Sequence, residues 1–103
     1  MVIESVKKLC IEGAIRWTDH AIVRIAQRGI SRADVKCALM TGGIIEQYPE
    51  DYPYPSCLML GNTLDNSPLH VVCGIGNDEL WVITAYFPDS TKWNDEYKNR
   101  MEK

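Results

Sequence analysis

The feature that most constrains the fold is a change of hydrophobic pattern near residue 43. Before it, apolar residues recur at helical spacing. After it, short β-branched and aromatic runs alternate with Pro, Gly, Asn and Asp, as in strands and turns. No helical pattern separates these runs, and consecutive strands without an intervening helix usually pair antiparallel. The chain is therefore predicted to be α+β, with helices covering one face of an antiparallel sheet.

Three helices are expected in the first 42 residues. The first runs over 2–13 and ends at a glycine. The second starts at Thr18 or Asp19 as N-cap and ends at Arg28. The third starts at Ser31, which has Asp34 three residues later in a capping-box arrangement, and ends at the glycine pair 42–43.

Four strands are expected after the helices, over 44–48, 57–61, 69–75 and 80–87. The stretch 49–55 contains three prolines and is predicted to be a loop, and 62–68 to be a turn. The segment 76–79 is short enough for a hairpin. The whole chain, 1–103, is predicted to be one domain, with helices over about 2–42, the sheet over about 43–88 and a polar tail over 89–103.

Composition excludes several classes of protein. No apolar run approaches the roughly 18 residues of a membrane span, and no signal peptide pattern opens the chain, so a cytoplasmic location is expected. The four cysteines are isolated and flanked by apolar residues, without the paired spacing of zinc ligands. They are interpreted as core thiols, and no metal or cofactor is expected.

Charge is distributed unevenly along the chain. The net charge is −3, but residues 1–36 carry a net +3 and residues 37–103 a net −6. Such asymmetry can mark a basic binding face beside an acidic body.

The second helix carries the strongest functional signal. At 100° per residue, His20, Arg24 and Arg28 fall within an arc of about 80° and form a row about 12 Å long. The opposite side is predicted to be core-facing, through Ala21, Ile22, Ile25 and Ala26. An ordinary solvated face usually mixes charges of both signs, whereas this one has none of the acids that would pair with the arginines. Acidic side chains from the later chain or an anionic ligand would have to compensate the row.

His70 is a candidate acid or base because imidazole titrates near neutral pH. The alternative is a half-buried histidine that a backbone carbonyl satisfies. If Ile75 faces Leu80 across the hairpin, a regular ladder sets His70 opposite Ala85 and directs Tyr86 to the other face of the sheet. Only a bulge or a register slip would bring His70 and Tyr86 into one site.

A polar and aromatic group closes the last strand. It consists of Thr84 and Tyr86, followed by Asp89 and Lys92. A site could be built at such a strand end, although a half-exposed strand has the same composition.

Several spaced motifs together resemble one bacterial family, the domain of unknown function 4258. They are His20-Ala21, Arg24, Arg28-Gly29-Ile30, the segment 51–61, Pro68-Leu69-His70-Val71-Val72, and Thr84-Ala85-Tyr86-Phe87-Pro88-Asp89. The resemblance covers roughly residues 5–93. That family is similar to toxins of bacterial toxin–antitoxin pairs in the RelE, ParE, BrnT and MqsR group, whose genes often lie beside that of a zinc-finger antitoxin.

The resemblance implies a RelE-like fold with helices on a curved antiparallel sheet, and a metal-independent endoribonuclease acting on messenger RNA. His20, Arg24, His70 and Tyr86 would then be catalytic, and Arg28, Thr84 and Lys92 would bind substrate. The partners would be RNA and an antitoxin protein. The chain departs from the strongly basic charge common in such toxins.

Two other hypotheses stay open. In one, the row formed by His20, Arg24 and Arg28 docks an acidic protein or an anionic small ligand without catalysis. In the other, His20 and Arg24 only fix the helix against the sheet. The sequence does not determine the oligomeric state.

Overall fold

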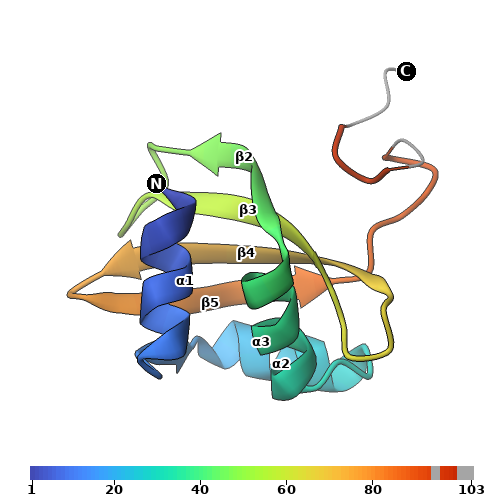
Figure 1. Ribbon diagram of the computed structural model, residues 1–103, viewed down its shortest axis with the longest axis horizontal. Helices are drawn as coiled ribbons and strands as arrows, with labels where there is room; N and C mark the ends of the chain where they lie inside the picture. The colour runs from blue at the N-terminus through green and yellow to red at the C-terminus, as the bar shows by residue number, and fades with distance from the viewer. Residues whose placement is uncertain (94–95, 100–103) are drawn as a thin grey trace.

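The computed structural model describes residues 1–93 and 96–99. Along the chain the elements are α1 (Ile3–Ile11), β1 (Ile15–Trp17), α2 (Asp19–Gln27), α3 (Arg32–Thr41), β2 (Gly43–Tyr48), β3 (Ser56–Asn62), β4 (Pro68–Gly76) and β5 (Glu79–Tyr86). The strands form one sheet in the order β1-β5-β4-β3-β2 (Figure 1). The predicted α+β class is confirmed. Residues 94–95 and 100–103 of the predicted tail lie outside the described part.

The prediction of four strands is wrong by one. β1 is a three-residue strand that pairs parallel with β5, with Ile15 opposite Leu80 and Trp17 opposite Val82. Such a short strand shows no alternating pattern, so it is hidden in the link between two predicted helices. The sheet is therefore mixed, because the pairs β2–β3, β3–β4 and β4–β5 are antiparallel.

The helix ends follow the predicted capping chemistry. The Thr18 side chain accepts a hydrogen bond from the Ala21 N–H at the start of α2, and Ser31 and Asp34 form a complete capping box at the start of α3. Gly13 and Gly29 follow α1 and α2 with φ of +73° and +68°, a region that glycine adopts without steric cost.

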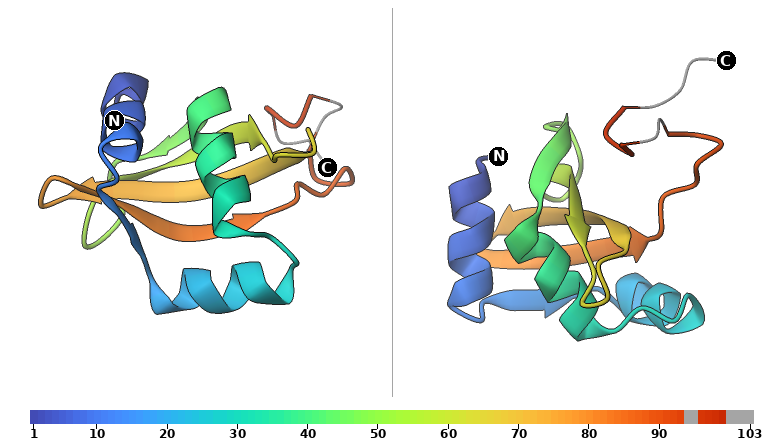
Figure 2. Two further views of the ribbon diagram at one scale, coloured as in Figure 1. Left: turned by 60° about the horizontal axis from the view of Figure 1, so that its bottom comes forward. Right: turned by 45° about the vertical axis from the view of Figure 1, so that its right-hand side comes forward.

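The helices do not all cover the sheet in the same way. α1 and α3 lie over one face, whereas α2 runs along the edge of the sheet, beside the part of β5 that extends past β1 (Figure 2). From this edge only Ala21 and Ile25 reach the core. Ile22 is 38% exposed and Ala26 is also exposed, so the prediction that both face the core is wrong. A helix at a sheet edge buries a narrower stripe than a helix lying over a face.

α3 and β3 pack backbone against backbone. A Cβ added at Gly61 would lie 2.0 Å from the Ala38 carbonyl oxygen, and one at Gly42 would lie 2.3 Å from the Leu60 carbonyl oxygen. Glycine is thus required for the approach of this helix to the sheet. The surrounding core is apolar and includes the fully buried Leu39 and Met59.

The register of β4 and β5 differs from the regular ladder expected from sequence. The hairpin itself agrees, because Asn77 and Asp78 form a two-residue turn with φ of +54° and +60°, and Ile75 faces Leu80. The register then shifts between Val72 and Cys73. Beyond this bulge His70 faces Tyr86 rather than Ala85. The bulge that the sequence left open is therefore present, and it brings the two side chains to one face of the sheet.

Candidate functional site

The row formed by His20, Arg24 and Arg28 lies on the exposed surface of α2. Arg24 donates a hydrogen bond to the Gln27 side chain at 3.3 Å. Within residues 1–93 and 96–99, neither arginine forms an ion pair with a carboxylate, and the ion pair found there joins Arg16 to Glu79 elsewhere on the sheet. Acids of the described chain therefore do not neutralise the row.

Arg28 connects this row to β5. Beyond Val82 the edge of β5 is no longer paired with β1, and its carbonyl groups need other donors. The Thr18 hydroxyl donates to the Ile83 carbonyl oxygen at 3.3 Å. The Arg28 guanidinium donates to the Ala85 carbonyl oxygen at 2.8 Å and to the Thr84 hydroxyl at 3.3 Å. Side chains from α2 and its cap thus close the strand edge in place of a neighbouring strand.

Tyr86 continues the arrangement toward the interior. Its half-buried ring lies 6.0 Å from the Arg28 guanidinium carbon, within the range of a cation–π contact. The ring also meets His70 edge-on, with centroids 5.4 Å apart. His70 in turn meets the Trp93 ring edge-on at 4.4 Å. A continuous series of contacts therefore leads from Arg28 at the surface through Tyr86 and His70 to Trp93.

His70 is fully buried within this series of contacts. Its Nε2 lies 2.8 Å from the Tyr97 carbonyl oxygen. The imidazole therefore has a backbone carbonyl partner, as one of the two sequence interpretations proposed, but it is entirely buried rather than half-buried. In this conformation it does not face solvent.

The structure brings together four of the seven residues proposed from sequence: Arg28, Thr84, Tyr86 and His70. His20 and Arg24 lie on the same helix surface as Arg28, without hydrogen bonds that tie them to β5 in the described chain. Lys92 is exposed, and its backbone N–H donates to the Asp89 carbonyl. The described contacts do not connect its side chain to the group.

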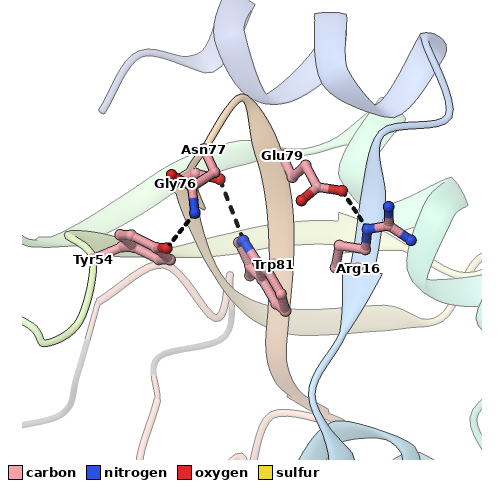
Figure 3. Close-up of polar contacts among 6 residues, drawn as sticks. All are labelled: Arg16, Tyr54, Gly76, Asn77, Glu79 and Trp81. Atoms are coloured by element: carbon pink, nitrogen blue, oxygen red, sulfur yellow. Dashed lines mark hydrogen bonds and ion pairs between the residues drawn. The ribbon is translucent and has the colours of Figure 1, made fainter.

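A pocket that the sequence reading missed lies on the sheet face opposite α1 and α3. Its volume is about 410 Å³, and Tyr52, Pro53 and Tyr54 of the 49–55 loop face Trp81 and Ile83 of β5 across it. The walls are fixed by hydrogen bonds, from the Trp81 indole N–H to the Gly76 carbonyl oxygen at 3.3 Å and from the Asn77 amide to the Tyr54 hydroxyl at 2.9 Å (Figure 3).

Glycines in β4 were the signal that could have revealed this pocket. A Cβ at Gly76 would lie 2.4 Å from the Tyr54 ring, and one at Gly74 would lie 3.0 Å from the Pro55 carbonyl oxygen. Glycine inside a strand marks a close approach of another group. Together with the Tyr- and Pro-rich composition of residues 49–55, the glycines of β4 indicate that this loop folds onto the strand.

The cysteines form no metal site in the described chain, where no cluster of three or more potential ligands occurs. All four are free thiols, and Cys57 and Cys73 are buried with sulfur atoms 3.8 Å apart. The hydrogen bond between them lowers the pKa of Cys57 and, together with burial, raises that of Cys73. Cys10 and Cys37 are only partly buried, so the interpretation as core thiols holds fully for two of the four.

Comparison with known proteins yields one finding. A family model described as "Domain of unknown function (DUF4258)" matches residues 17–87, a segment that includes α2, the basic row and the whole of β5. No curated protein and no solved structure matches the chain.

Proposed function

The chain belongs to the DUF4258 family, and on that premise we propose that it is a toxin-like, metal-independent endoribonuclease of a toxin–antitoxin pair. RNA would bind on the surface formed by α2 and the end of β5. The resemblance of the family to RelE, ParE and BrnT toxins supports the reaction class. The observation that carries the proposal is the row formed by His20, Arg24 and Arg28, which lacks carboxylate partners in the described chain and ends against Tyr86.

Each part of this surface has a chemical counterpart in single-stranded RNA. Arginine side chains pair with phosphate oxygens, often through two parallel hydrogen bonds. An aromatic ring such as Tyr86 offers a face or edge on which a base can stack. Thr84, held by Arg28, adds a hydroxyl at the same place. The row is about 12 Å long, so it can meet more than one phosphate.

Cleavage without a metal needs a base, a charge stabiliser and an acid. The base takes the proton of the 2′-hydroxyl, whose oxygen attacks the adjacent phosphorus. The bond to the 5′-oxygen breaks, and the acid protonates that oxygen, leaving a 2′,3′-cyclic phosphate and a 5′-hydroxyl. His20 is the histidine that faces solvent, so we assign it one proton-transfer role. Tyr86 takes part in the other proton transfer. Arg24 and Arg28 stabilise the negative charge of the phosphorane.

The remaining predicted residues take supporting roles in this proposal. His70 lies behind Tyr86 and positions its ring, because it contacts Tyr86 from the buried side. Lys92 is exposed beyond the end of β5 and contributes positive charge for the RNA backbone.

The test is cleavage of a structured RNA by purified protein in EDTA at low salt. Arg24→Ala is the informative variant because the Arg24 side chain is exposed and, in the described chain, hydrogen-bonds only to Gln27, so the fold should survive. Lys8→Ala, an exposed change on α1, is the matched control. We expect wild type and Lys8→Ala to leave cyclic-phosphate ends and Arg24→Ala to be inactive. Equal cleavage by Arg24→Ala would refute the proposed site.

The second candidate function is a non-catalytic module that docks an acidic antitoxin protein or an anionic ligand on the same row. The net charge of −3 favours it over RNA binding, because a compact anionic ligand meets only the basic row, whereas a long RNA strand also meets the acidic body. Tight binding of an acidic neighbour protein, with no RNA cleavage by folded wild type alone or with ribosomes, would select this function.

A further inference from the structure

The pocket between the 49–55 loop and β5 has no part in the cleavage chemistry above. We propose that it binds a guanine base. The inference rests on the proposed function for the source of that base. In that function, the base belongs to an RNA strand whose phosphates lie along the row formed by His20, Arg24 and Arg28.

The walls of the pocket suit a flat aromatic ring. Tyr54 and Trp81 are both half-buried, and each is held by a hydrogen bond to the β4–β5 hairpin, so their positions are set before a ligand arrives. Tyr52 is 95% exposed at the rim and can cover a bound ring. A volume of about 410 Å³ lies in the range of small-ligand sites.

Asp51 supplies the polar recognition. It is the one charged side chain among the residues lining the pocket, and an ionised carboxylate only accepts hydrogen bonds. One of its oxygens accepts from the hydroxyl of the buried Ser56, which fixes the carboxylate. Guanine presents two adjacent donors, N1–H and the N2 amino group, to the two oxygens of a carboxylate. The negative charge also keeps phosphate out, so the base rather than the backbone enters.

Two residues that line the pocket belong to, or adjoin, the elements of the proposed RNA surface. Thr18 lines the pocket and is the N-cap of α2, the helix that carries the basic row. Ile83 also lines it, and the next residue, Thr84, accepts a hydrogen bond from Arg28. A strand that follows β5 can therefore place one base in the pocket while its phosphates face the row.

The experiment measures affinity for guanosine 5′-monophosphate and adenosine 5′-monophosphate by isothermal titration calorimetry. A second arm uses uridine hexamers that contain a single G or a single A. We expect guanine to be preferred about tenfold in both arms. Asp51→Asn, which replaces an acceptor by a donor, should abolish the preference. Tyr52→Ala, an exposed change that spares the fold, should weaken binding about fivefold or more. Glu50→Gln, in the same loop but outside the pocket lining, should do neither.

The outcomes separate the two proposals. Equal affinity for the two nucleotides, or a preference that survives in Asp51→Asn, overturns the pocket assignment. If RNA is bound and cleaved without any base preference, the pocket assignment fails alone. If the free guanosine nucleotide binds with the expected preference but no RNA binds, the pocket stands with the nucleotide as its ligand, and the ribonuclease proposal fails.

Discussion

Arg28 is the residue at which the edge of the sheet and the basic surface meet. Its guanidinium satisfies a β5 carbonyl and a threonine hydroxyl, and it lies against Tyr86. The side chain of Arg24, one turn earlier, hydrogen-bonds only to Gln27 in the described chain. The two arginines look alike in sequence, yet the structure gives one a place in the fold and leaves the other directed at solvent.

Replacement of these two arginines should therefore separate stability from binding. Arg28→Ala removes two hydrogen bonds from a charged donor and leaves the Ala85 carbonyl without it, so we expect the free energy of unfolding to fall by about 1–3 kcal/mol. Arg24→Ala should change it by less than about 0.5 kcal/mol. Urea denaturation followed by circular dichroism measures both, and equal losses would contradict the assignment of Arg28 to the strand edge.

At the scale of elements, residues that act through local chemistry could be predicted and residues that depend on tertiary placement could not. The starts of α2 and α3 could be predicted because the side chains of Thr18, Ser31 and Asp34 hydrogen-bond to nearby backbone N–H groups. The bulge in β5 has no comparable signature in the local sequence, because it arises from pairing with β4. This bulge decides whether Tyr86 meets His70. The site was thus predicted as a set of residue types, while its grouping, the burial of His70 and the pocket at Trp81 required the structure.

The contact between α3 and β3 gives a prediction with an internal control. Gly61→Ala places a methyl group against the Ala38 carbonyl, where backbone rather than a flexible side chain would have to move. We expect it to lower the free energy of unfolding by about 1–3 kcal/mol or more. Gly43→Ala, at a position with nothing within 4 Å of the added Cβ, should change it by less than about 0.5 kcal/mol. Comparable denaturation midpoints for the two variants would show that the helix can shift away at little cost.

The capping box of α3 predicts a pH dependence. Hydrogen bonds from the Leu64 and Ser31 backbone N–H groups, with a further one from the Ser31 side chain, lower the pKa of Asp34 below its ordinary value of 3.8. A carboxyl whose pKa is depressed by folding stabilises the native state above its unfolded pKa, and this stabilisation is lost as the pH falls through the folded value. Asp34→Asn should therefore lower the melting temperature at pH 7, and the gap from wild type should narrow below pH 3.8.

Thr18→Ala is the control for that measurement. It removes the cap of the neighbouring helix without removing a titrating group, at a cost of about 1 kcal/mol. The loss in melting temperature caused by Thr18→Ala should be similar at pH 7 and below pH 3.8. A gap for Asp34→Asn that stays constant down to pH 2 would contradict the role of the ionised carboxylate.

Across the whole molecule, positive and negative charges are separated along the chain. The net charge is −3, but the acids are concentrated after residue 36 and the basic row stands on α2. Under the proposed function, an RNA strand would be attracted at the edge of the sheet where α2 lies beside β5, and the acidic part of the chain would repel it elsewhere. Few phosphates can be neutralised in this way, so the salt dependence of binding should be shallow.

This argument gives the salt slope a definite size. For single-stranded nucleic acid, log K falls with log salt at about 0.7 per neutralised phosphate, so contacts by Arg24, Arg28 and Lys92 predict a slope of about −2.1. Arg24→Ala should reduce the magnitude of that slope by about 0.7, while Lys8→Ala on α1 should leave it unchanged. Fluorescence anisotropy of a labelled uridine oligomer measures the slope, with the salt concentration varied from about 20 to about 200 mM. A slope that Arg24→Ala does not alter would mean that the RNA backbone lies elsewhere, and that the missing carboxylate partners of the row are supplied by a protein.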